Sequence, residues 1–448
     1  MAAPPEVPGL PLIGSLLDLR GGQVRFLRRV REEHGDIAMV RVGTFRLVVA
    51  SRPEWVQHVL QGNARNYDKN TRGFNKLRMV LGNGLLTSEG AFWLRQRRMA
   101  QPAFSRTQLA ALAVVMRDKV EDLANNWTQA RANQGPGSVV RSIDIDMMEL
   151  ALAVVGETLL GRSLGSEAIE ISAALEEVLG YVRWRTTVPD AVEKLPLRRN
   201  REFIKANEAL DGVVRGLIAD RREETTDAPD LLNRFMTAID PETGAQMDDG
   251  QLRDEVMTMF LAGHETTANA LTWTLHLLSL HPEIQQAVRD EVQEVADASD
   301  PTELRALGLT MRVLQESMRL YPPAWAVTRR SKAPDKLGEW DIEPDVFVIV
   351  SPYIVGRHPD VWPDPDRFDP DRFLPENTAE RHRFAYFPFG GGPRLCIGRD
   401  FAINEALIAL VILVGRFEFK PVDSEVEEVA KITLRPKGGL RLSVEVAS

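Results

Sequence analysis

The feature that most constrains this fold is a nearly unbroken helical pattern over residues 88–280. Inside it, residues 256–280 are mostly apolar, but they include Glu265 and two histidines, which are costly in lipid. This stretch therefore predicts a helix buried in a large protein rather than a membrane span. Further helices are expected near residues 282–297 and 308–320, where apolar side chains recur at helical spacing. Such a chain must bury its helices against one another, which favours a mainly α architecture.

Short β segments accompany the helices at both ends of the chain. Residues 37–49 alternate around Gly43-Thr44 and predict a β-hairpin. Near the C-terminus, residues 431–434 and 440–444 flank a turn rich in Pro and Gly, and they predict a second hairpin. The fold class expected is therefore mainly α with small β-sheets, an α+β arrangement.

The pattern indicates a single domain spanning residues 1–448. A helical core over about residues 88–320 is flanked by a β-rich N-terminal part, about residues 1–60, and by the region 331–448. The sequence contains no internal repeat, low-complexity tract or long linker that would divide it. Its hydrophobic content of 44% is enough for a sizeable core.

Charge and cysteine content bound the partners and the compartment. The chain carries 55 basic and 64 acidic residues, and its net charge of −9 argues against nucleic-acid binding. One cysteine in 448 residues fits a reducing compartment, so a cytoplasmic location is expected. Residues 1–11 have neither a basic region nor an apolar core, so neither a signal peptide nor a transmembrane anchor is expected.

The single cysteine, Cys396, lies in a loop suited to presenting a thiolate. The run Gly390-Gly391-Gly392 and Pro393 make this loop stiff and poor in side chains, a backbone able to lie flat against a large ligand. A helical pattern begins after Gly398, so Cys396 is expected at a helix N-terminus, where the helix dipole stabilises a thiolate. The alternative is a small buried structural cysteine beside an incidental glycine run.

This loop closely resembles the haem-binding signature of the cytochrome P-450 family, Phe-x-x-Gly-x-Arg-x-Cys-x-Gly. Phe389, Gly392, Arg394, Cys396 and Gly398 fill every defined place. The resemblance covers nearly the whole chain and implies the cytochrome P-450 fold, with haem b (iron protoporphyrin IX) as the cofactor and Cys396 as the iron ligand. It implies that Arg394 pairs with a haem propionate and that Phe389 and Gly398 complete the haem-binding loop. Without an anchor, the chain looks like a soluble, bacterial-type member.

A second motif lies in the middle of the buried helix, where residues 262–266 read Ala-Gly-His-Glu-Thr. Glycine inside a helix costs about 1 kcal/mol relative to Ala, so Gly263 is expected to permit a local distortion and the close approach of a ligand. The motif resembles the family's oxygen-activation motif, Ala-Gly-x-Glu-Thr. The resemblance implies two catalytic residues: Thr266 would hydrogen-bond bound dioxygen, and Glu265 would help relay protons to it. The alternative is a set of polar residues that face a cavity or cap a kink.

Glu316 and Arg319 form a third candidate group, because their i,i+3 spacing places them on one helix face. That spacing alone is common, but it resembles the family's Glu-x-x-Arg motif. The resemblance implies a third partner downstream, and Arg372 supplies it. A buried carboxylate between two arginines is tolerable only as a hydrogen-bonded network. The implied role is structural, holding the Cys396 loop in register.

Trp93 and Arg97 lie one helical turn apart and resemble the family's Trp-x-x-x-Arg motif. The resemblance implies that both contact the haem and that Arg97 pairs with a propionate. The alternative is a basic helix face on the surface. Arg95 and Arg98 are assigned to such a face, and with Arg399 they could form a patch for an acidic electron donor.

The substrate pocket is the part that the sequence determines least. By resemblance, the pocket is expected to include the apolar side chains of Phe74, Leu77, Leu85, Leu261, Ala262, Trp325 and Val327. Their bulk favours a lipophilic substrate such as a fatty acid, terpene, steroid or polyketide. Side chains of these types belong to the core more often than to a pocket.

The function expected is that of a haem-thiolate monooxygenase, which uses dioxygen and two externally supplied electrons to hydroxylate or epoxidise a lipophilic molecule. The sequence lacks the glycine patterns of nucleotide-binding folds, so electrons are expected from a ferredoxin or flavodoxin with its reductase. A monomer is expected. Two alternatives remain: a haem-thiolate peroxygenase or isomerase and, more distantly, a non-enzymatic helical binding protein.

Overall fold

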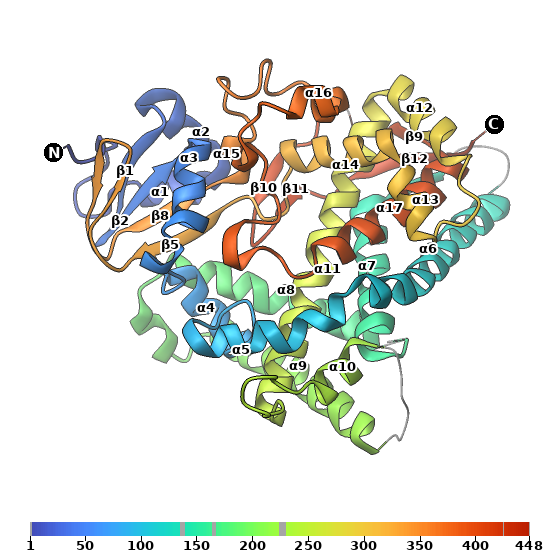
Figure 1. Ribbon diagram of the computed structural model, residues 1–448, viewed down its shortest axis with the longest axis horizontal. Coiled ribbons are helices and arrows are strands. Elements are labelled where there is room, and N and C mark those ends of the chain that lie inside the picture. The colour runs from blue at the N-terminus through green and yellow to red at the C-terminus, as the bar shows by residue number, and fades with distance from the viewer. Residues whose placement is uncertain (1, 135–138, 164–166, 224–229, 424, 448) are drawn as a thin grey trace. The chain divides into compact units, whose positions relative to one another are not determined.

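The structure is a computed structural model that describes residues 2–134, 139–163, 167–223, 230–423 and 425–447. These residues fall into two compact units, each assembled from segments far apart in the sequence (Figure 1). Unit 1 comprises Met1–Asn75, Gln315–Cys396 and Glu428–Arg435, and unit 2 comprises Lys76–Leu314, Ile397–Glu427 and Pro436–Ser448. The expectation of a single domain stays a prediction.

Unit 1 holds most of the β-structure, including a five-stranded sheet in the order β1-β2-β8-β5-β3. Its strands are β1 (Ile37–Val42), β2 (Phe45–Ala50), β3 (Tyr67–Asp68), β5 (Val327–Ser331), β6 (Asp335–Leu337), β7 (Trp340–Ile342), β8 (Phe347–Val350) and β10 (Glu428–Ala430). Its helices are α1 (Leu16–Gly21), α2 (Gln23–His34), α3 (Pro53–Gln57), α15 (Pro352–Val355) and α16 (Pro375–Thr378). Helices α4 (Arg72–Leu81) and α14 (Gly308–Leu320), and strand β11 (Leu434–Pro436), contribute residues to both units.

The hairpin predicted over residues 37–49 is confirmed, because β1 and β2 pair in an antiparallel register. Gly43 in the connecting turn has φ +59°, a conformation that favours glycine. Strand β8 then joins β2 in parallel, and β5 joins β8 in an antiparallel register. The sheet buries an apolar cluster that includes Val348, Phe384 and Phe387. The segment leading into the Cys396 loop is thereby packed onto the sheet.

Unit 2 is almost entirely helical. Its helices are α5 (Gly90–Ala100), α6 (Arg106–Gln134), α7 (Ile143–Leu160), α8 (Glu167–Thr186), α9 (Arg198–Glu223), α10 (Leu231–Thr237), α11 (Asp249–Leu280), α12 (Pro282–Val292), α13 (Pro301–Ala306) and α17 (Arg399–Arg416). A three-stranded sheet has the order β4 (Val139–Ser142), β12 (Arg441–Val446) and β9 (Phe417–Pro421). The expectation of a mainly α chain with small β-sheets is confirmed.

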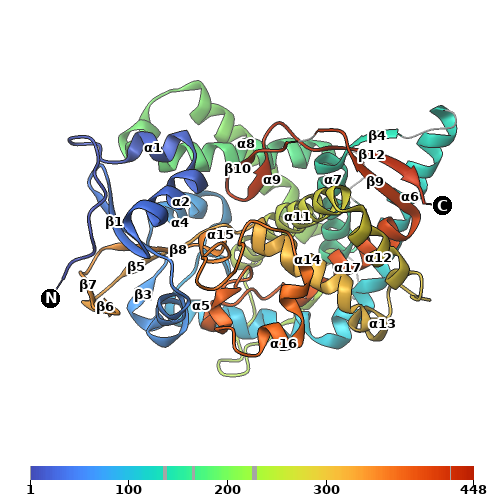
Figure 2. The same ribbon diagram turned by 90° about the horizontal axis from the view of Figure 1, so that it is seen from above.

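Helix α11 is the long buried helix predicted from the sequence, and it lies beside α7 and α17 (Figure 2). Its N-terminus is capped by Asp248, whose carboxylate accepts a hydrogen bond from the Gln251 N–H at 2.8 Å. The helix continues without a break through Gly263, and a local distortion there stays a prediction. A Cβ at Gly263 would lie 2.9 Å from Val155 Cγ2 on α7. The glycine is therefore explained by the close packing of two helices.

The second predicted hairpin, residues 431–434 with 440–444, is wrong. Leu442 of β12 pairs with Pro421 of β9 on one side and with Arg141 of β4 on the other. Strand β11 instead pairs with β10 in a separate two-stranded sheet. Alternating side chains identify a strand, but its partners come from distant segments and depend on tertiary packing.

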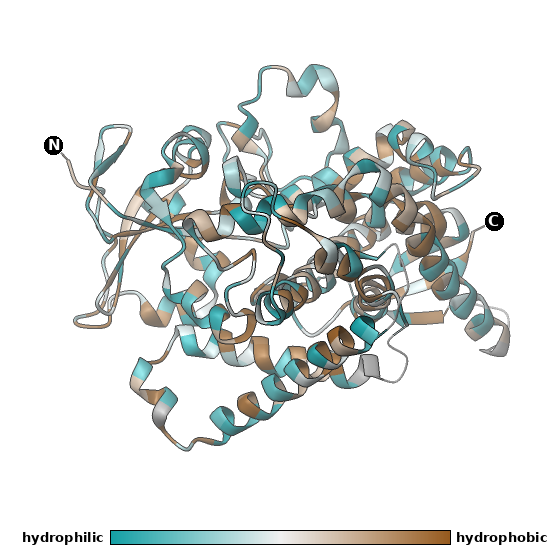
Figure 3. Cartoon of the chain, turned by 60° about the horizontal axis from the view of Figure 1, so that its bottom comes forward, coloured by the Kyte–Doolittle hydropathy of each residue, from teal (hydrophilic) through white to brown (hydrophobic). Residues whose placement is uncertain are grey.

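Hydrophobic and hydrophilic residues alternate along many of the helices, as in amphipathic helices (Figure 3). In α2, for example, Val24, Phe26, Leu27 and Val30 are buried while most of the charged residues between them reach the surface. Among the described helices, none combines the length and the apolar character needed to cross a bilayer.

Candidate active site

The loop that carries Cys396 closes on itself within unit 1. The Cys396 N–H donates a hydrogen bond to the Phe389 carbonyl oxygen, with an N···O distance of 3.0 Å. The Leu395 N–H donates to the Gly392 carbonyl oxygen at 3.1 Å. The Cys396 side chain is exposed at the end of this closed loop. This exposure contradicts the alternative of a buried structural cysteine.

Two of the three glycines in the loop are required by packing inside unit 1. At Gly392, which has φ +64°, a Cβ would overlap the carbonyl oxygen of Leu60. At Gly391, a Cβ would overlap the ring of Phe384, whereas Gly390 has open space around it. The flat, side-chain-free backbone expected to face a ligand is thus explained at two positions by contact with the protein itself.

The predicted helix after the loop is confirmed, because α17 begins at Arg399, three residues after Cys396 in the sequence. Gly398 is its N-cap residue, and the Ala402 N–H donates to the Gly398 carbonyl oxygen at 2.9 Å. The first N–H groups of a helix have no partners within the helix, and they favour negative charge near the helix start.

Glu316 and Arg319 form a fully buried ion pair near the C-terminal end of α14. The Arg319 Nε and Nη2 atoms donate to the two carboxylate oxygens of Glu316 at 2.6 and 2.7 Å. Arg372 Nε lies 3.3 Å from Glu316 Oε1, and the Asp369 N–H donates to the same oxygen at 2.9 Å. Unit 1 thus brings Glu316, Arg319 and Arg372 into one network.

This network also binds the irregular segment that precedes the Cys396 loop. Arg319 Nη1 donates to the carbonyl oxygens of Gly356 and Pro365, both at 2.6 Å. Tyr386, just before the loop, is fully buried, and this burial together with the charge of Glu316 raises its pKa. The network therefore links α14 to the segment that leads into the loop.

Trp93 and Arg97 lie one turn apart on α5, and both side chains are partly buried. Arg98 was assigned to a basic surface face, and this prediction is wrong. Its Nη2 atom lies 3.0 Å from the carboxylate of Asp240, which is fully buried, and its Nη1 atom lies 2.8 Å from Glu242. A carboxylate that is 142 residues away therefore neutralises this arginine.

The other two members of the proposed basic patch have partners of different charge. Arg95 Nη2 donates to Gln251 Oε1 at 3.1 Å, and Arg399 Nε donates to Asp400 Oδ1 at 2.7 Å. An arginine paired with a carboxylate, such as Arg98 or Arg399, adds little net charge to a docking surface, whereas Arg95 keeps its charge because the Gln251 amide is neutral. The role of this patch as the site for an electron donor stays a prediction.

The middle of α11 has one accessible side. Residues 255–279 are buried except for Met259, Ala262, Gly263 and Thr266, which are partly exposed. Their spacing of i, i+3, i+4 and i+7 places them on one face of the helix, and these four residues define the accessible stripe. Glu265 lies off the stripe and is 2% exposed.

The Thr266 hydroxyl donates a hydrogen bond to the Ala262 carbonyl oxygen at 2.7 Å, so its oxygen keeps its lone pairs as acceptors. Three other threonines of α11, Thr258, Thr272 and Thr274, make the same bond to the carbonyl four residues earlier. The bond alone therefore does not distinguish Thr266. Its position on the accessible stripe does.

Met259 is a stripe residue that the sequence reasoning missed. A signal was present, because Met259 lies seven residues before Thr266, and that spacing returns to the same helix face after two turns. A methionine adapts its shape to apolar ligands. It therefore joins Ala262 and Thr266 as a candidate for contact with a ligand.

Glu405 of α17 is another fully buried carboxyl group in unit 2. Burial raises its pKa to about 8, and the nearby hydroxyl group of Thr267 on α11 offsets only part of this effect. Above its ordinary pKa of 4.5, the unfolded chain ionises this group while the folded chain keeps it protonated. Stability is therefore lost as the pH rises from about 4.5 towards 8.

Replacing Glu405 by Gln removes this cost, because the amide stays neutral at every pH. Near pH 5 the variant is expected to be more stable than the wild-type protein by about 1 kcal/mol or less, whereas at pH 8 it should be more stable by about 4 kcal/mol. Urea unfolding followed by circular dichroism at both pH values measures the difference. Glu208→Gln, at an exposed position on α9, serves as the control. An equal effect of Glu405→Gln at pH 5 and pH 8 contradicts the neutral state.

The seven residues expected to line the pocket are divided between the two units. In unit 2, Leu85 and Leu261 are buried and Leu77 and Ala262 are partly exposed, and in unit 1 Phe74, Trp325 and Val327 are partly exposed. The ring of Phe74 lies 5.1 Å from Lys69 Nζ, and Trp325 Nε1 donates to the Lys431 carbonyl oxygen at 3.2 Å. Their role in a pocket stays a prediction.

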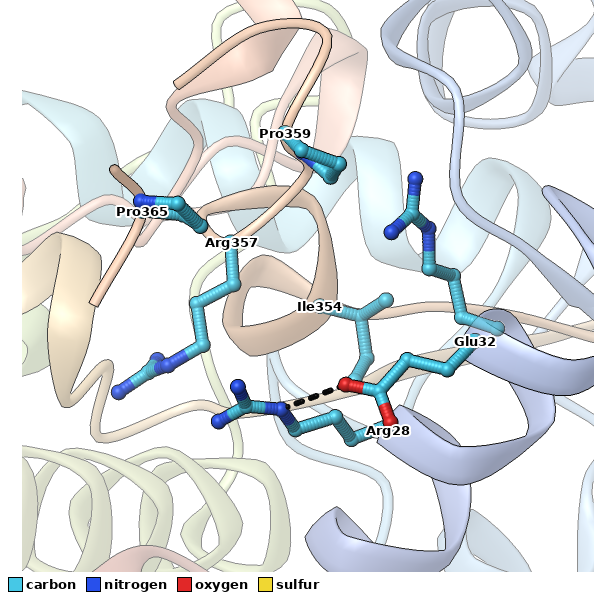
Figure 4. A pocket seen from close by; sticks show the side chains of 7 residues that line it. Arg28, Glu32, Ile354, Arg357, Pro359 and Pro365 are labelled. Atoms are coloured by element: carbon cyan, nitrogen blue, oxygen red, sulfur yellow. Dashed lines mark hydrogen bonds and ion pairs between the residues drawn. The ribbon is translucent and has the colours of Figure 1, made fainter. Parts of the chain in front are cut away.

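A surface pocket of about 200 Å³ lies in unit 1 beside α2 and α15 (Figure 4). Its lining residues are Arg28, Arg31, Glu32, Ile354, Arg357, Pro359 and Pro365. Arg28 pairs with Glu32 at 2.9 Å and with Asp366 at 2.6 Å, and Arg357 pairs with Asp366 at 3.0 Å. These arginines serve the local structure, and none of the predicted site residues lines this pocket.

Comparison with known proteins identifies the family to which the chain belongs. Residues 4–442 match the family model described as Cytochrome P-450. Cyclooctatin synthase of Streptomyces melanosporofaciens is 38% identical over 439 residues, which cover 96% of this chain and 92% of the relative. Cyclooctat-9-en-7-ol 5-monooxygenase of the same organism is 35% identical, over 94% of this chain and 92% of the relative. Pentalenene oxygenase of Streptomyces avermitilis is 33% identical, over 97% and 95%.

Proposed function

The chain belongs to the cytochrome P-450 family, and on this premise we propose that it oxygenates a terpene, with Cys396 as the ligand of the haem iron. Members of the family bind haem b through a cysteine thiolate and use dioxygen, external electron donors and lipophilic substrates. The protein is accordingly a haem-thiolate monooxygenase. The alternatives of a peroxygenase, an isomerase or a non-enzymatic binding protein are not favoured by these relatives.

The assignment of Cys396 is supported by the chemistry of the donor. It is the only cysteine of the chain, and its side chain is exposed at the end of a closed loop. A thiolate there fits an iron ligand, and the haem, when bound, supplies the centre at which dioxygen is activated. Arg97 and Arg394 are proposed to pair with the propionates, and Trp93, Phe389 and Gly398 to shape the rest of the haem contact.

Thr266 and Glu265 are proposed to handle protons during the reaction. The accessible Thr266 oxygen can accept a hydrogen bond, and its hydroxyl hydrogen can turn from the Ala262 carbonyl toward a bound molecule. Glu265 is a buried carboxyl group next to it in the sequence and is proposed to pass protons to Thr266. Insertion of one oxygen atom into the substrate consumes two electrons and two protons and yields one water.

The substrate class is supported by the names of two relatives. One is named as a monooxygenase of cyclooctat-9-en-7-ol and the other as an oxygenase of pentalenene, and both compounds are terpenes. The apolar residues expected around the pocket agree with a substrate of this kind. Titration of the purified holoenzyme with a panel of terpenes tests the proposal, because a substrate that displaces water from the iron shifts the haem from low to high spin. A shift with fatty acids alone would replace the terpene by another lipophilic class.

We propose that a ferredoxin or flavodoxin with its reductase supplies the electrons and that the protein acts as a monomer. A cytoplasmic location is supported by the presence of one cysteine in 448 residues, which suits a reducing compartment.

Replacing Thr266 by Ala is expected to uncouple electron use from product formation. Without the hydroxyl group, proton delivery fails, and the two electrons and two protons leave with dioxygen as hydrogen peroxide. The fraction of electrons recovered in product is expected to fall about ten-fold or more. Donor oxidation, peroxide and product are measured in the same reaction.

Thr274→Ala is the matched control for this experiment. Thr274 makes the same hydrogen bond, to the Ala270 carbonyl oxygen at 2.7 Å, but it is fully buried and lies off the accessible stripe. Its replacement should leave the coupling of electrons to product unchanged. Full coupling in Thr266→Ala would remove Thr266 from the proton pathway.

A further inference from the structure

One short stretch of α11 binds the backbone of the turn between α4 and α5. Asp254 Oδ2 accepts a hydrogen bond from the Asn83 N–H at 2.7 Å. The next residue, Glu255, accepts one from the Leu85 N–H through Oε2 at 2.9 Å. These contacts lie within unit 2, and they join two neighbouring side chains of the helix to alternate N–H groups of the turn.

The backbone of this turn lies directly against the helix. At Gly82, which has φ +55°, a Cβ would overlap the Asp254 carboxylate. At Gly84, a Cβ would overlap the Thr258 hydroxyl oxygen and would lie 2.6 Å from the Asp254 carbonyl oxygen. A larger residue at either glycine would push the turn away from α11. Close approach and hydrogen bonding therefore act at the same place.

The turn is also closed internally by hydrogen bonds, which stiffen it. The Thr87 hydroxyl donates to the Gly82 carbonyl oxygen at 2.9 Å, and the Ser88 N–H donates to the Gly84 carbonyl oxygen at 2.9 Å. Arg78 Nη2 of α4 donates to the Thr87 carbonyl oxygen at 2.8 Å. A rigid turn takes its position from whatever holds its outer face, and here α11 does so.

Glu255 holds the turn at a cost to stability. The side chain is fully buried, and burial raises its pKa to about 8, which the bond from Leu85 only partly offsets. Its Oε1 atom is buried with no hydrogen-bond partner among the described residues. An unpaired buried polar atom costs about 1–3 kcal/mol. An apolar residue would avoid this cost, so the carboxyl group contributes something other than stability.

The contact occurs where the accessible stripe begins. Thr258, which Gly84 approaches, immediately precedes Met259, the first stripe residue. Thr266 follows Thr258 by eight residues, about 12 Å along the axis of an α-helix. One unbroken helix therefore sets the distance between the turn and Thr266.

We propose that Asp254 and Glu255 are positioning residues, which fix the turn carrying Leu85 relative to Thr266 and so decide which carbon of the substrate is oxygenated. This inference rests on the proposed function, in which Leu85 contacts the substrate. The two carboxyl groups touch neither the substrate nor the haem, and they act only through the turn.

The test compares Glu255→Leu with Glu255→Gln in the holoenzyme. The leucine removes the acceptor of the Leu85 N–H, so hydrogen–deuterium exchange of that amide is expected to quicken about ten-fold. The ratio of product regioisomers should shift about three-fold or more. The glutamine keeps a carbonyl acceptor in the same place and should retain both the slow exchange and the wild-type ratio.

Gly84→Ala alters the same turn without changing α11. It therefore tests the inference even if the Glu255→Leu protein fails to fold. Its Cβ should displace the turn from Thr258 and change the product ratio in the same way. Gly216→Ala is the matched control, because a Cβ at that position on α9 meets nothing within 4 Å. It should leave the exchange and the product ratio as they are in the wild type.

Either of two results overturns the inference. The first is an unchanged exchange rate of the Leu85 amide in both Glu255→Leu and Gly84→Ala. The second is a faster exchange rate of this amide together with the wild-type product ratio and the wild-type substrate affinity. The exchange measurement needs no substrate. A failure of the proposed terpene class would instead appear in the wild-type protein, as the absence of any spin shift with terpenes. The product ratio would then be measured on the lipophilic compound that does give a shift.

Discussion

The Cys396→Ala protein, reduced and exposed to carbon monoxide, is expected to lack the red-shifted Soret band of thiolate ligation. The loss should be complete, because the chain has no second cysteine to supply a thiolate. The fold should survive, since the Cys396 side chain is exposed and the bond from its N–H to Phe389 needs only the backbone. Absorption spectra and far-ultraviolet circular dichroism of the same sample separate ligand loss from unfolding.

A matched change one residue away keeps the experiment specific. Ile397→Val removes one methylene group next to the cysteine and should keep the thiolate band in full. A normal thiolate band in Cys396→Ala would contradict the assignment of the iron ligand. The iron ligand would then be a residue other than Cys396.

Replacing Glu316 by Ala is expected to lower the free energy of unfolding by about 3–5 kcal/mol, because it leaves a buried charge without its partner. Both side chains of the Glu316–Arg319 pair are 0% exposed, and their two hydrogen bonds are 2.6 and 2.7 Å long. Burial already lowers the pKa of Arg319, and Glu316 counteracts part of that effect. Urea unfolding of the purified protein measures the loss, and haem content per chain shows whether the Cys396 loop is affected.

An exposed ion pair in the same unit provides the comparison. Arg28 and Glu32 lie 2.9 Å apart on α2, but their side chains are 43% and 53% exposed. Glu32→Ala should therefore cost less than about 1 kcal/mol, as surface pairs do. Similar losses for Glu316→Ala and Glu32→Ala would show that burial does not govern the strength of the network.

The spacing of residues along the chain correctly predicted structural features that depend only on residues close together in the sequence. The i,i+3 spacing placed Glu316 and Arg319 on one helix face, where they pair, and the Gly43-Thr44 turn predicted the first hairpin. Both depend on backbone geometry that repeats within a few residues. The same holds for the helix after Cys396, which begins at Arg399.

Features that depend on distant partners were missed or assigned wrongly. The sequence alone indicates that Arg98 is a surface arginine, but in the structure it pairs with Asp240, which is far away in the sequence. The close packing of Gly263 against Val155 of α7, which leaves little room for a Cβ, was missed. The sequence pattern predicted that strand β12 forms one strand of a hairpin, but its partners in the structure are β4 and β9. Each outcome follows from tertiary contacts that no local pattern encodes.

By itself, the sequence determined the family, the haem and the monooxygenase chemistry, because the short loop around Cys396 and the short motif around Thr266 resemble family signatures that are defined by the order of residues along the chain. Only the tertiary structure decided which side of α11 is accessible, that Met259 lies on it, and that Asp254 and Glu255 hold the turn of Leu85. The physical reason is that the groups of a motif follow from covalent order, whereas exposure and hydrogen-bond partners depend on which distant segments pack together.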